Sequence, residues 1–135
     1  MALLTWSSSM EVGIGEIDRQ HKKLVDLINT LHEGMLAKKT KEALGKTLAE
    51  LISYTKSHFG TEEKYFDRFG YPDAAKHKKE HVAFAGKVLD FQKKFEDGSI
   101  LISMEIMTFL REWLVKHIQG SDKAYGPFLK GKGVV

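Results

Sequence analysis

The sequence predicts an all-α protein, an up-down-up-down four-helix bundle with an N-terminal arm. Apolar residues recur three and four positions apart through most of the 135 residues, which is the period of an α-helix. Only two prolines, Pro72 and Pro127, interrupt this pattern. The predicted helices are joined by short connections, which favour antiparallel neighbours. Because 42% of the residues are hydrophobic, the chain can form one core, and we expect a single domain over residues 1–135.

The first two helices have clear boundary signals. The first is expected over residues 18–38, with Asp18 as N-cap, and its inward positions are Ile17, His21, Leu24, Ile28, Leu31 and Met35. Residues 1–16 remain as the arm, for which Trp6 is the predicted anchor. The second helix is expected over residues 41–69, between Thr40 and Gly70, and its inward positions are Leu44, Leu48, Leu51, Thr55, His58, Glu62, Tyr65 and Phe69.

The last two helices follow the same pattern. The third is expected over residues 73–96, after Pro72, and its inward positions are His77, His81, Phe84, Val88, Phe91 and Phe95. The fourth is expected over residues 101–119, towards Gly120, and its inward positions are Ile106, Leu110, Trp113 and His117. Each predicted helix therefore has one apolar side, into which a few polar residues are inserted.

The composition excludes several classes of protein. Cysteine is absent, so disulfides, thiolate nucleophiles and iron–sulfur ligation are excluded, and any metal must be bound by His, Asp or Glu. The net charge of +3 comes from lysines spread along the chain, without a motif that reads a groove, so we expect no nucleic-acid partner. No signal peptide or membrane span is recognisable, and we expect a cytoplasmic protein.

The inserted polar residues are the strongest functional signal. His58 and Glu62 are four residues apart, as are His77 and His81, so each pair points to one side of its helix. Burial of an ionised carboxylate or an unpartnered imidazole costs several kcal/mol, which implies a common binding partner for these groups. Individual hydrogen-bonded core histidines are the alternative explanation, and they fit each residue better singly than all of them together.

His117 and Asp122 are five residues apart, which is roughly 140° around an ideal α-helix. They can reach one site if Gly120 loosens the backbone, or if a bridged pair of metals spreads the target. We favour the second explanation, with a contribution from the first. His32 is eleven residues after His21, roughly 16 Å further along the helix, and is therefore predicted not to be a ligand.

The antiparallel order places seven polar side chains at one depth in the bundle, since the starts of helices one and three adjoin the ends of helices two and four. These predicted metal ligands are His21, His58, Glu62, His77, His81, His117 and Asp122. Five imidazoles and two carboxylates exceed the capacity of one metal and match two metals that share both carboxylates. Imidazole with bridging carboxylate and no thiolate favours two irons over copper.

These residues resemble the hemerythrin family, and more closely its single-domain bacterial members, the bacteriohemerythrins. The resemblance covers almost the whole chain, through Trp6 and the segments 17–21, 58–63, 70–72, 77–81 and 113–118, with Asp122 and Tyr125. It implies one iron held by His77, His81 and His117 and another held by His21 and His58. Glu62, Asp122 and an oxo or hydroxo group would bridge the two irons, and the second iron would keep an open position.

The resemblance implies a protein that binds dioxygen reversibly, as a carrier or store, and nitric oxide or another small anion could take the same position. The predominance of imidazole over carboxylate independently favours reversible binding over oxygen activation. We expect an oxygen pocket lined by Leu24, Phe59, Trp113, Leu114, Ile118 and Tyr125. A sensor domain and a di-iron peroxidase or oxidase are the alternatives; 135 residues leave no room for an output domain unless the chain is a piece of a longer protein. Hydrogen-bond acceptors for the imidazole N–H groups are expected at unnamed positions.

Overall fold

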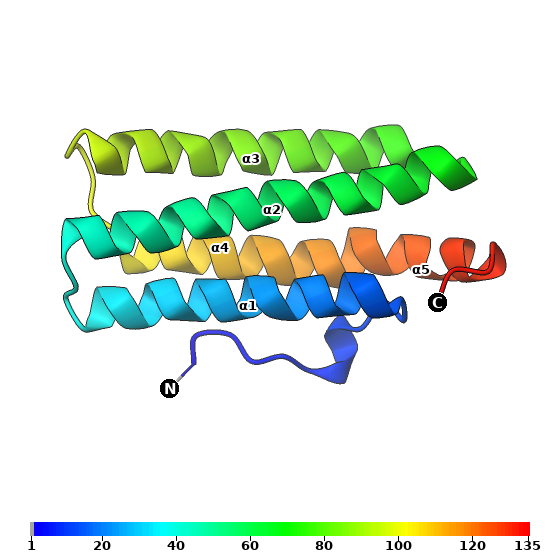
Figure 1. The fold of residues 1–135 in the computed structure, drawn as a ribbon, viewed down its shortest axis with the longest axis horizontal. Coiled ribbons are helices and arrows are strands. Elements are labelled where there is room, and N and C mark those ends of the chain that lie inside the picture. The colour runs from blue at the N-terminus through cyan, green and yellow to red at the C-terminus, as the bar shows by residue number, and fades with distance from the viewer. Residues whose placement is uncertain (1) are drawn as a thin grey trace.

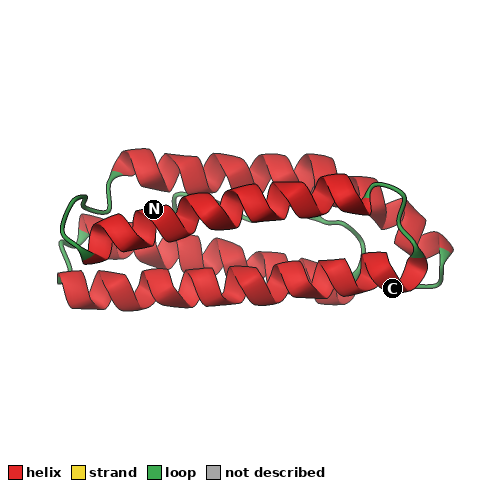
Figure 2. Ribbon diagram, turned by 90° about the horizontal axis from the view of Figure 1, so that it is seen from above, coloured by secondary structure: helices red, strands yellow, loops and turns green. Residues whose placement is uncertain are grey.

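The computed structural model describes residues 2–135 and contains four long antiparallel helices, with no strand in this range (Figure 1). This arrangement confirms the predicted bundle. In chain order the elements are η1 (Ser8–Met10), α1 (Gly15–Leu36), α2 (Lys41–Phe69), α3 (Ala74–Glu96), α4 (Met104–Lys116), the π-helix η2 (His117–Asp122) and α5 (Lys123–Gly131). The view from above separates the four helices into two layers (Figure 2). Within residues 2–135, no helix is long and apolar enough to span a lipid bilayer.

Helix α1 begins three residues before the predicted N-cap. Its N-cap is Ile14, and Asp18 lies within the first turns of the helix. The Asp18 carboxylate accepts hydrogen bonds from the backbone N–H groups of Val12 and Gly13, at 2.7 and 3.1 Å. Asp18 therefore stabilises the chain that enters the helix, and it does so from inside the helix.

Local signals define both ends of α2. The Thr40 hydroxyl oxygen accepts a hydrogen bond from the backbone N–H of Ala43 at 3.1 Å, and this N-cap contact satisfies one of the free donors at the helix start. Gly70 ends the helix in the left-handed conformation, with φ of 68°, which costs little without a side chain. The next helix, α3, begins only four residues later, so the two helices pack as antiparallel neighbours.

The C-terminal region differs from the prediction. The fourth helix was expected over residues 101–119, but α4 spans Met104–Lys116, with the Ser103 hydroxyl as N-cap, and the helical path continues through η2 and α5 to Gly131. Gly120 and Pro127 lower the helix propensity of this segment, but Tyr125 and Leu129 are fully buried. Their burial against the bundle outweighs the local preference against a helix.

The N-terminal arm runs back along α1 (Figure 1). The Asn29 side chain holds it by accepting from the Leu4 N–H at 3.0 Å and donating to the Leu4 carbonyl at 2.7 Å. Trp6, the predicted anchor, is only half-buried, whereas Leu4 and Met10 are buried in the core. The apolar side chains on both sides of Trp6 therefore secure the arm more than Trp6 itself.

The buried apolar residues form two clusters. The larger one fills most of the bundle, from the arm to Phe95 and Ile102. The smaller one closes the end of the bundle beside α5 and consists of Val12, Ile14, Ile17, Phe66, Tyr71, Tyr125 and Leu129. A Cβ added to Gly126 would lie 2.8 Å from the Val12 carbonyl oxygen, so the arm and α5 can pack this closely only with glycine there.

Candidate metal centre

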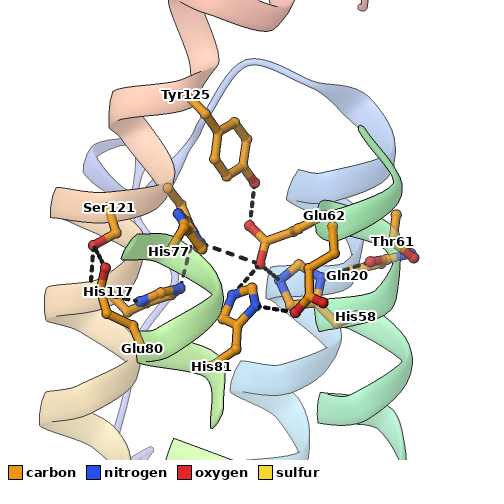
Figure 3. Close-up of polar contacts among 12 residues, drawn as sticks. Gln20, His58, Thr61, Glu62, His77, Glu80, His81, His117, Ser121 and Tyr125 are labelled. Atoms are coloured by element: carbon orange, nitrogen blue, oxygen red, sulfur yellow. Dashed lines mark hydrogen bonds and ion pairs between the residues drawn. The ribbon is translucent and has the colours of Figure 1, made fainter. Parts of the chain in front are cut away.

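The seven polar side chains predicted to be metal ligands, all of them on α1, α2, α3 and η2, come together inside the bundle at one end, and none is more than 4% exposed. Figure 3 shows how the side chains from α2, α3 and the C-terminal segment point towards one another. Each helix contributes residues from one turn or from two successive turns. The bundle thus brings residues 21 to 122 into one buried polar cluster, which we call the histidine cluster.

The histidine cluster contains two overlapping sets of ligand atoms. Within each set the nitrogen and oxygen atoms lie within 4.8 Å of one another, close enough for a single metal ion. One set is Glu62, His77, His81, His117 and Asp122, and the other is His21, His58, Glu62 and Asp122. Both carboxylates belong to both sets, so two ions bound here would share them.

Asp122 presents one oxygen atom to each set. Its Oδ1 lies 2.9 Å from Nε2 of His77 and 3.1 Å from Nε2 of His117, whereas its Oδ2 lies 3.0 Å from Nε2 of His21. Glu62 uses a single oxygen, since its Oε1 lies 3.3 Å from Nε2 of His58 and 3.1 Å from Nε2 of His81. These positions suit carboxylates that bridge two cations.

The π-helix η2 explains how His117 and Asp122 reach the same site. A π-helix forms hydrogen bonds between residues five apart, which brings such residues towards the same side of the helix. The backbone therefore closes the angle of roughly 140° that separates them on an α-helix. Of the two explanations drawn from the sequence, the structure shows a loosened backbone, and the favoured one, metals spreading the target, is not needed for the convergence.

The histidine cluster has many buried polar atoms without a hydrogen-bond partner. Among residues 2–135, every buried side-chain nitrogen or oxygen atom that lacks one belongs to this cluster, except Nδ1 of His32. The unpartnered atoms include Nε2 of His77, His81 and His117 and both oxygens of Asp122. These atoms lie close to one another around a common space. Burial of so many polar atoms without hydrogen bonds costs free energy unless cations bind among them. The residues therefore fit a metal centre.

The electrostatics of the cluster also favour cations. Burial raises the pKa of the Glu62 and Asp122 carboxyls, but contacts with the surrounding imidazoles outweigh burial, so the pKa of each lies below its usual value, and well below it for Asp122. Burial lowers the pKa of His117, but the contacts with Asp122 raise it by a larger amount, so the net shift is upwards. Anionic carboxylates thus attract positive charge, and a metal cation can take the place of protons on the imidazoles.

Three of the imidazoles have a side-chain neighbour at Nδ1, and two of these neighbours lie within hydrogen-bond distance. Nδ1 of His58 lies 2.7 Å from Oε1 of Gln20 (Figure 3), and Nδ1 of His81 lies 2.9 Å from Oε2 of Glu63. Nδ1 of His117 lies 3.6 Å from Oε1 of Glu80. The first two contacts orient their rings so that Nε2 would face a bound metal. One signal in the sequence could have found Gln20, Glu63 and Glu80, because each of them is the direct neighbour of a predicted ligand.

Tyr125 contacts the cluster from the side of α5. Its hydroxyl donates a hydrogen bond of 2.5 Å to Oε2 of Glu62, the oxygen that faces away from the imidazoles (Figure 3). Burial, together with the Glu62 charge, raises the pKa of Tyr125 well above its usual value, so the phenol stays protonated and remains a donor. Tyr125, which the sequence analysis placed in the oxygen pocket, thus contacts one of the two carboxylates that belong to both ligand sets.

Four of the six residues expected to line an oxygen pocket surround one small apolar cavity beside the cluster. The cavity measures ≈ 10 Å³, and Leu24, Phe59, Trp113 and Leu114 are part of its wall. Phe59 stacks on His81 with ring centroids 3.7 Å apart, and Trp113 stacks on His117 at 4.3 Å. Ile118 and Tyr125 are not among the residues that line this cavity; Ile118 is buried in the larger core cluster and Tyr125 in the smaller one.

His32 lies outside the histidine cluster. It is 7% exposed and belongs to neither set of ligand atoms. Its Nδ1 is buried without a hydrogen-bond partner, as the cluster atoms are, but no carboxylate or second imidazole of residues 2–135 forms a ligand set with it. The prediction from depth along the helix therefore agrees with the ligand sets.

Fold and site together define a class of protein, the four-helix bundles that bind metal through histidines and carboxylates in their core. Residues 12–129 match the family described as the hemerythrin HHE cation binding domain, and the chain belongs to this family.

Named relatives agree with this assignment. The chain is 38% identical over 130 residues to a bacteriohemerythrin of Stenotrophomonas maltophilia, covering 96% of this chain and 84% of the relative. It is 41% identical over 130 residues to a bacteriohemerythrin of Methylococcus capsulatus, covering 96% and 98% of the two chains. A crystal structure of wild-type hemerythrin superposes with a TM-score of 0.88 at 40% identity, covering 93% of this chain and 97% of the other.

Proposed function

We propose that the chain is a single hemerythrin-like domain that holds two irons and binds dioxygen reversibly, as an oxygen carrier or store and not as an enzyme. The observation that carries this proposal is the pair of overlapping ligand sets that share Glu62 and Asp122. His77, His81 and His117 would hold one iron, and His21 and His58 would hold the other. The two carboxylates and an oxo or hydroxo group would bridge them.

When bound, such a pair of irons supplies two electrons that dioxygen can take up and return. The side chains of this protein control what surrounds that exchange. The wall formed by Leu24, Phe59 and Leu114 is apolar and excludes water from the neighbourhood of His81, on which Phe59 stacks. Figure 3 shows the Tyr125 hydroxyl at the cluster, where it donates its hydrogen bond to Glu62. Because the pKa of Tyr125 is also raised, this hydroxyl is a poor proton donor.

A site with few proton donors favours return of the ligand over its breakdown, because general acid catalysis needs a positioned donor. The ligand set supports the same conclusion. Oxygen-activating di-iron sites in ferritin-like bundles use about four carboxylates and two histidines, whereas here five imidazoles accompany two carboxylates. The names of the curated relatives, bacteriohemerythrins, are consistent with the proposal.

Two measurements test the proposal. Elemental analysis of protein expressed in iron-replete medium is expected to give two irons per chain. The optical spectrum of the reduced protein is expected to gain a visible absorption band in air and to lose it on degassing, over repeated cycles. One metal ion per chain, or stoichiometric zinc, would contradict the di-iron assignment.

Irreversible oxidation within one cycle would instead favour the oxidase or peroxidase alternative. Turnover of hydrogen peroxide with a reducing co-substrate would identify that activity directly. A matched control is His32→Ala, which removes a buried histidine of the same helix as His21 but outside the ligand sets. This variant is expected to keep both irons and the reversible spectrum.

A further inference from the structure

The histidine cluster poses a problem of access, because its seven side chains are between 0 and 4% exposed. A metal ion cannot reach atoms this deeply buried without passing through the wall of the bundle. Hydrated divalent ions avoid apolar surfaces, so the apolar cavity next to Phe59 and Trp113 is a poor route for them. A route for ions should be polar and should begin at the surface.

One surface pocket satisfies both conditions and reaches a residue of the cluster. It measures ≈ 60 Å³ and lies between the start of α3 and the segment from η2 to α5, lined by Tyr71, Asp73, Lys76, His77, Glu80, Ser121 and Ala124. Asp73 and Lys76 are exposed at its mouth, Glu80 is half-buried, and His77 is 3% exposed at its inner end. Exposure thus decreases stepwise from the surface to a ligand of the cluster.

Carboxylates lie along this path from the surface to the cluster. Asp73 and Glu80 line the pocket and Asp122 lies in the cluster behind it. Burial, followed by the charges of these three carboxylates, raises the pKa of Tyr71 in the pocket wall. A pocket with this field concentrates cations. Lys76 at the mouth opposes the effect.

Glu80 stands between the pocket and the cluster. Its Oε1 accepts a hydrogen bond from the Ser121 hydroxyl at 2.7 Å and lies 3.6 Å from Nδ1 of His117 (Figure 3). That Nδ1 is buried and has no hydrogen-bond partner, so the inner side of Glu80 faces an unsatisfied polar atom of a ligand. Ser121 lies in η2, between His117 and Asp122, and its contact with Glu80 on α3 connects the two walls of the pocket.

We propose that this pocket is the port through which iron(II) enters and leaves the buried centre, with the Glu80 carboxylate as the transient ligand between Asp73 at the mouth and His77 at the inner end. The proposal rests on the metal centre of the proposed function. When the Ser121 hydroxyl releases Glu80, the carboxylate can turn towards an ion in the pocket. The ion then has only His77 and His117 to pass before it meets Asp122.

The test is the rate of iron exchange in the purified, iron-loaded protein. Reduced protein is mixed anaerobically with an excess of an iron(II) chelator, and the rate of chelate formation is measured. A carboxylate that stabilises the ion in transit lowers the barrier in both directions. Glu80→Gln should therefore slow iron loss by about tenfold, and Asp73→Asn by about threefold, as expected for charge contacts close to water. Lys76→Gln should accelerate it by about threefold.

Glu63→Gln is the matched control, because Glu63 contacts the Nδ1 of a ligand as Glu80 does but does not line the pocket. The port predicts no slowing for this variant. If Glu80 merely positions His117, Glu80→Gln will accelerate iron loss, and Asp73→Asn and Lys76→Gln will have no effect, which overturns the port. If the unaltered protein binds no iron, the proposed function fails as well, so the two failures are distinguishable.

Discussion

His21 and His32 are both buried on α1, eleven residues apart, in different surroundings. His21 lies 3.0 Å from Asp122 and 4.6 Å, between ring centroids, from His58, within the layer to which four helices contribute polar side chains. His32 belongs to neither set of ligand atoms and lies in the C-terminal half of α1. The comparison teaches that burial of a histidine does not create a ligand, whereas convergence of several helices at one depth does.

The same contrast separates the histidine cluster from the apolar core. In the core, each side chain contributes by leaving water, and a substitution removes only its own contacts. In the cluster, each polar atom depends on the others and on the cations between them, so one substitution leaves several atoms unpaired. The following variants test this contrast, from the largest expected effect to the smallest.

Asp122→Ala should have the largest effect, because Asp122 offers one oxygen to each set of ligands. We expect the loss of both metal ions and a decrease of about 3 to 5 kcal/mol in the free energy of unfolding, as for a buried charged group whose partner is removed. Elemental analysis and urea unfolding measure the two effects. Asp26→Ala, at an exposed position of α1, is the control. Retention of two ions by the Asp122 variant would contradict the shared-carboxylate arrangement.

Leu110→Ala should affect stability without affecting the metal. Leu110 is 1% exposed in the larger core cluster, and its truncation is expected to cost about 3 kcal/mol through lost burial and a residual cavity. Urea unfolding and metal analysis of the same sample check both parts. Loss of metal from the folded variant would show that the core and the histidine cluster are not independent.

Tyr125→Phe should have a smaller effect, since it removes one hydrogen bond and keeps the ring. The expected decrease in the free energy of unfolding is about 1 to 2 kcal/mol, because Oε2 of Glu62 loses its donor while the aromatic contacts with Phe66 remain. Released from Tyr125, Glu62 should also bind the metals differently, which a shift of the visible absorption bands would report. An unchanged spectrum would show that Tyr125 does not position Glu62.

His32→Leu should have the smallest effect. It replaces a buried imidazole that has an unpartnered Nδ1 with an apolar side chain of similar size, so stability should change by no more than about 1 kcal/mol in either direction. Metal content is expected to stay at the unaltered value. If His32→Leu releases metal, the distinction between the two halves of α1 is wrong.

Much of the fold was predictable from the sequence because helical signals are local. The spacing of Leu44, Leu48 and Leu51 marks the inner side of α2, and Thr40 and Gly70 mark its ends. Where the prediction was wrong, a contact with a segment outside the helix was responsible. Asp18 accepts hydrogen bonds from the arm and is not an N-cap, and α5 forms in spite of Pro127 because its apolar side covers the end of the bundle.

The candidate site, like the fold, has a part that the sequence predicts and a part that it does not. The identity and depth of its seven polar residues follow from the sequence, because four-residue spacing and antiparallel order are geometric consequences of helices joined by short connections. Only the tertiary structure decided that η2 is a π-helix, that Glu80 meets Ser121 and that Tyr125 holds Glu62. Each of these depends on where a side chain of one helix meets another element, and such meetings are determined by packing in three dimensions, which no local pattern encodes.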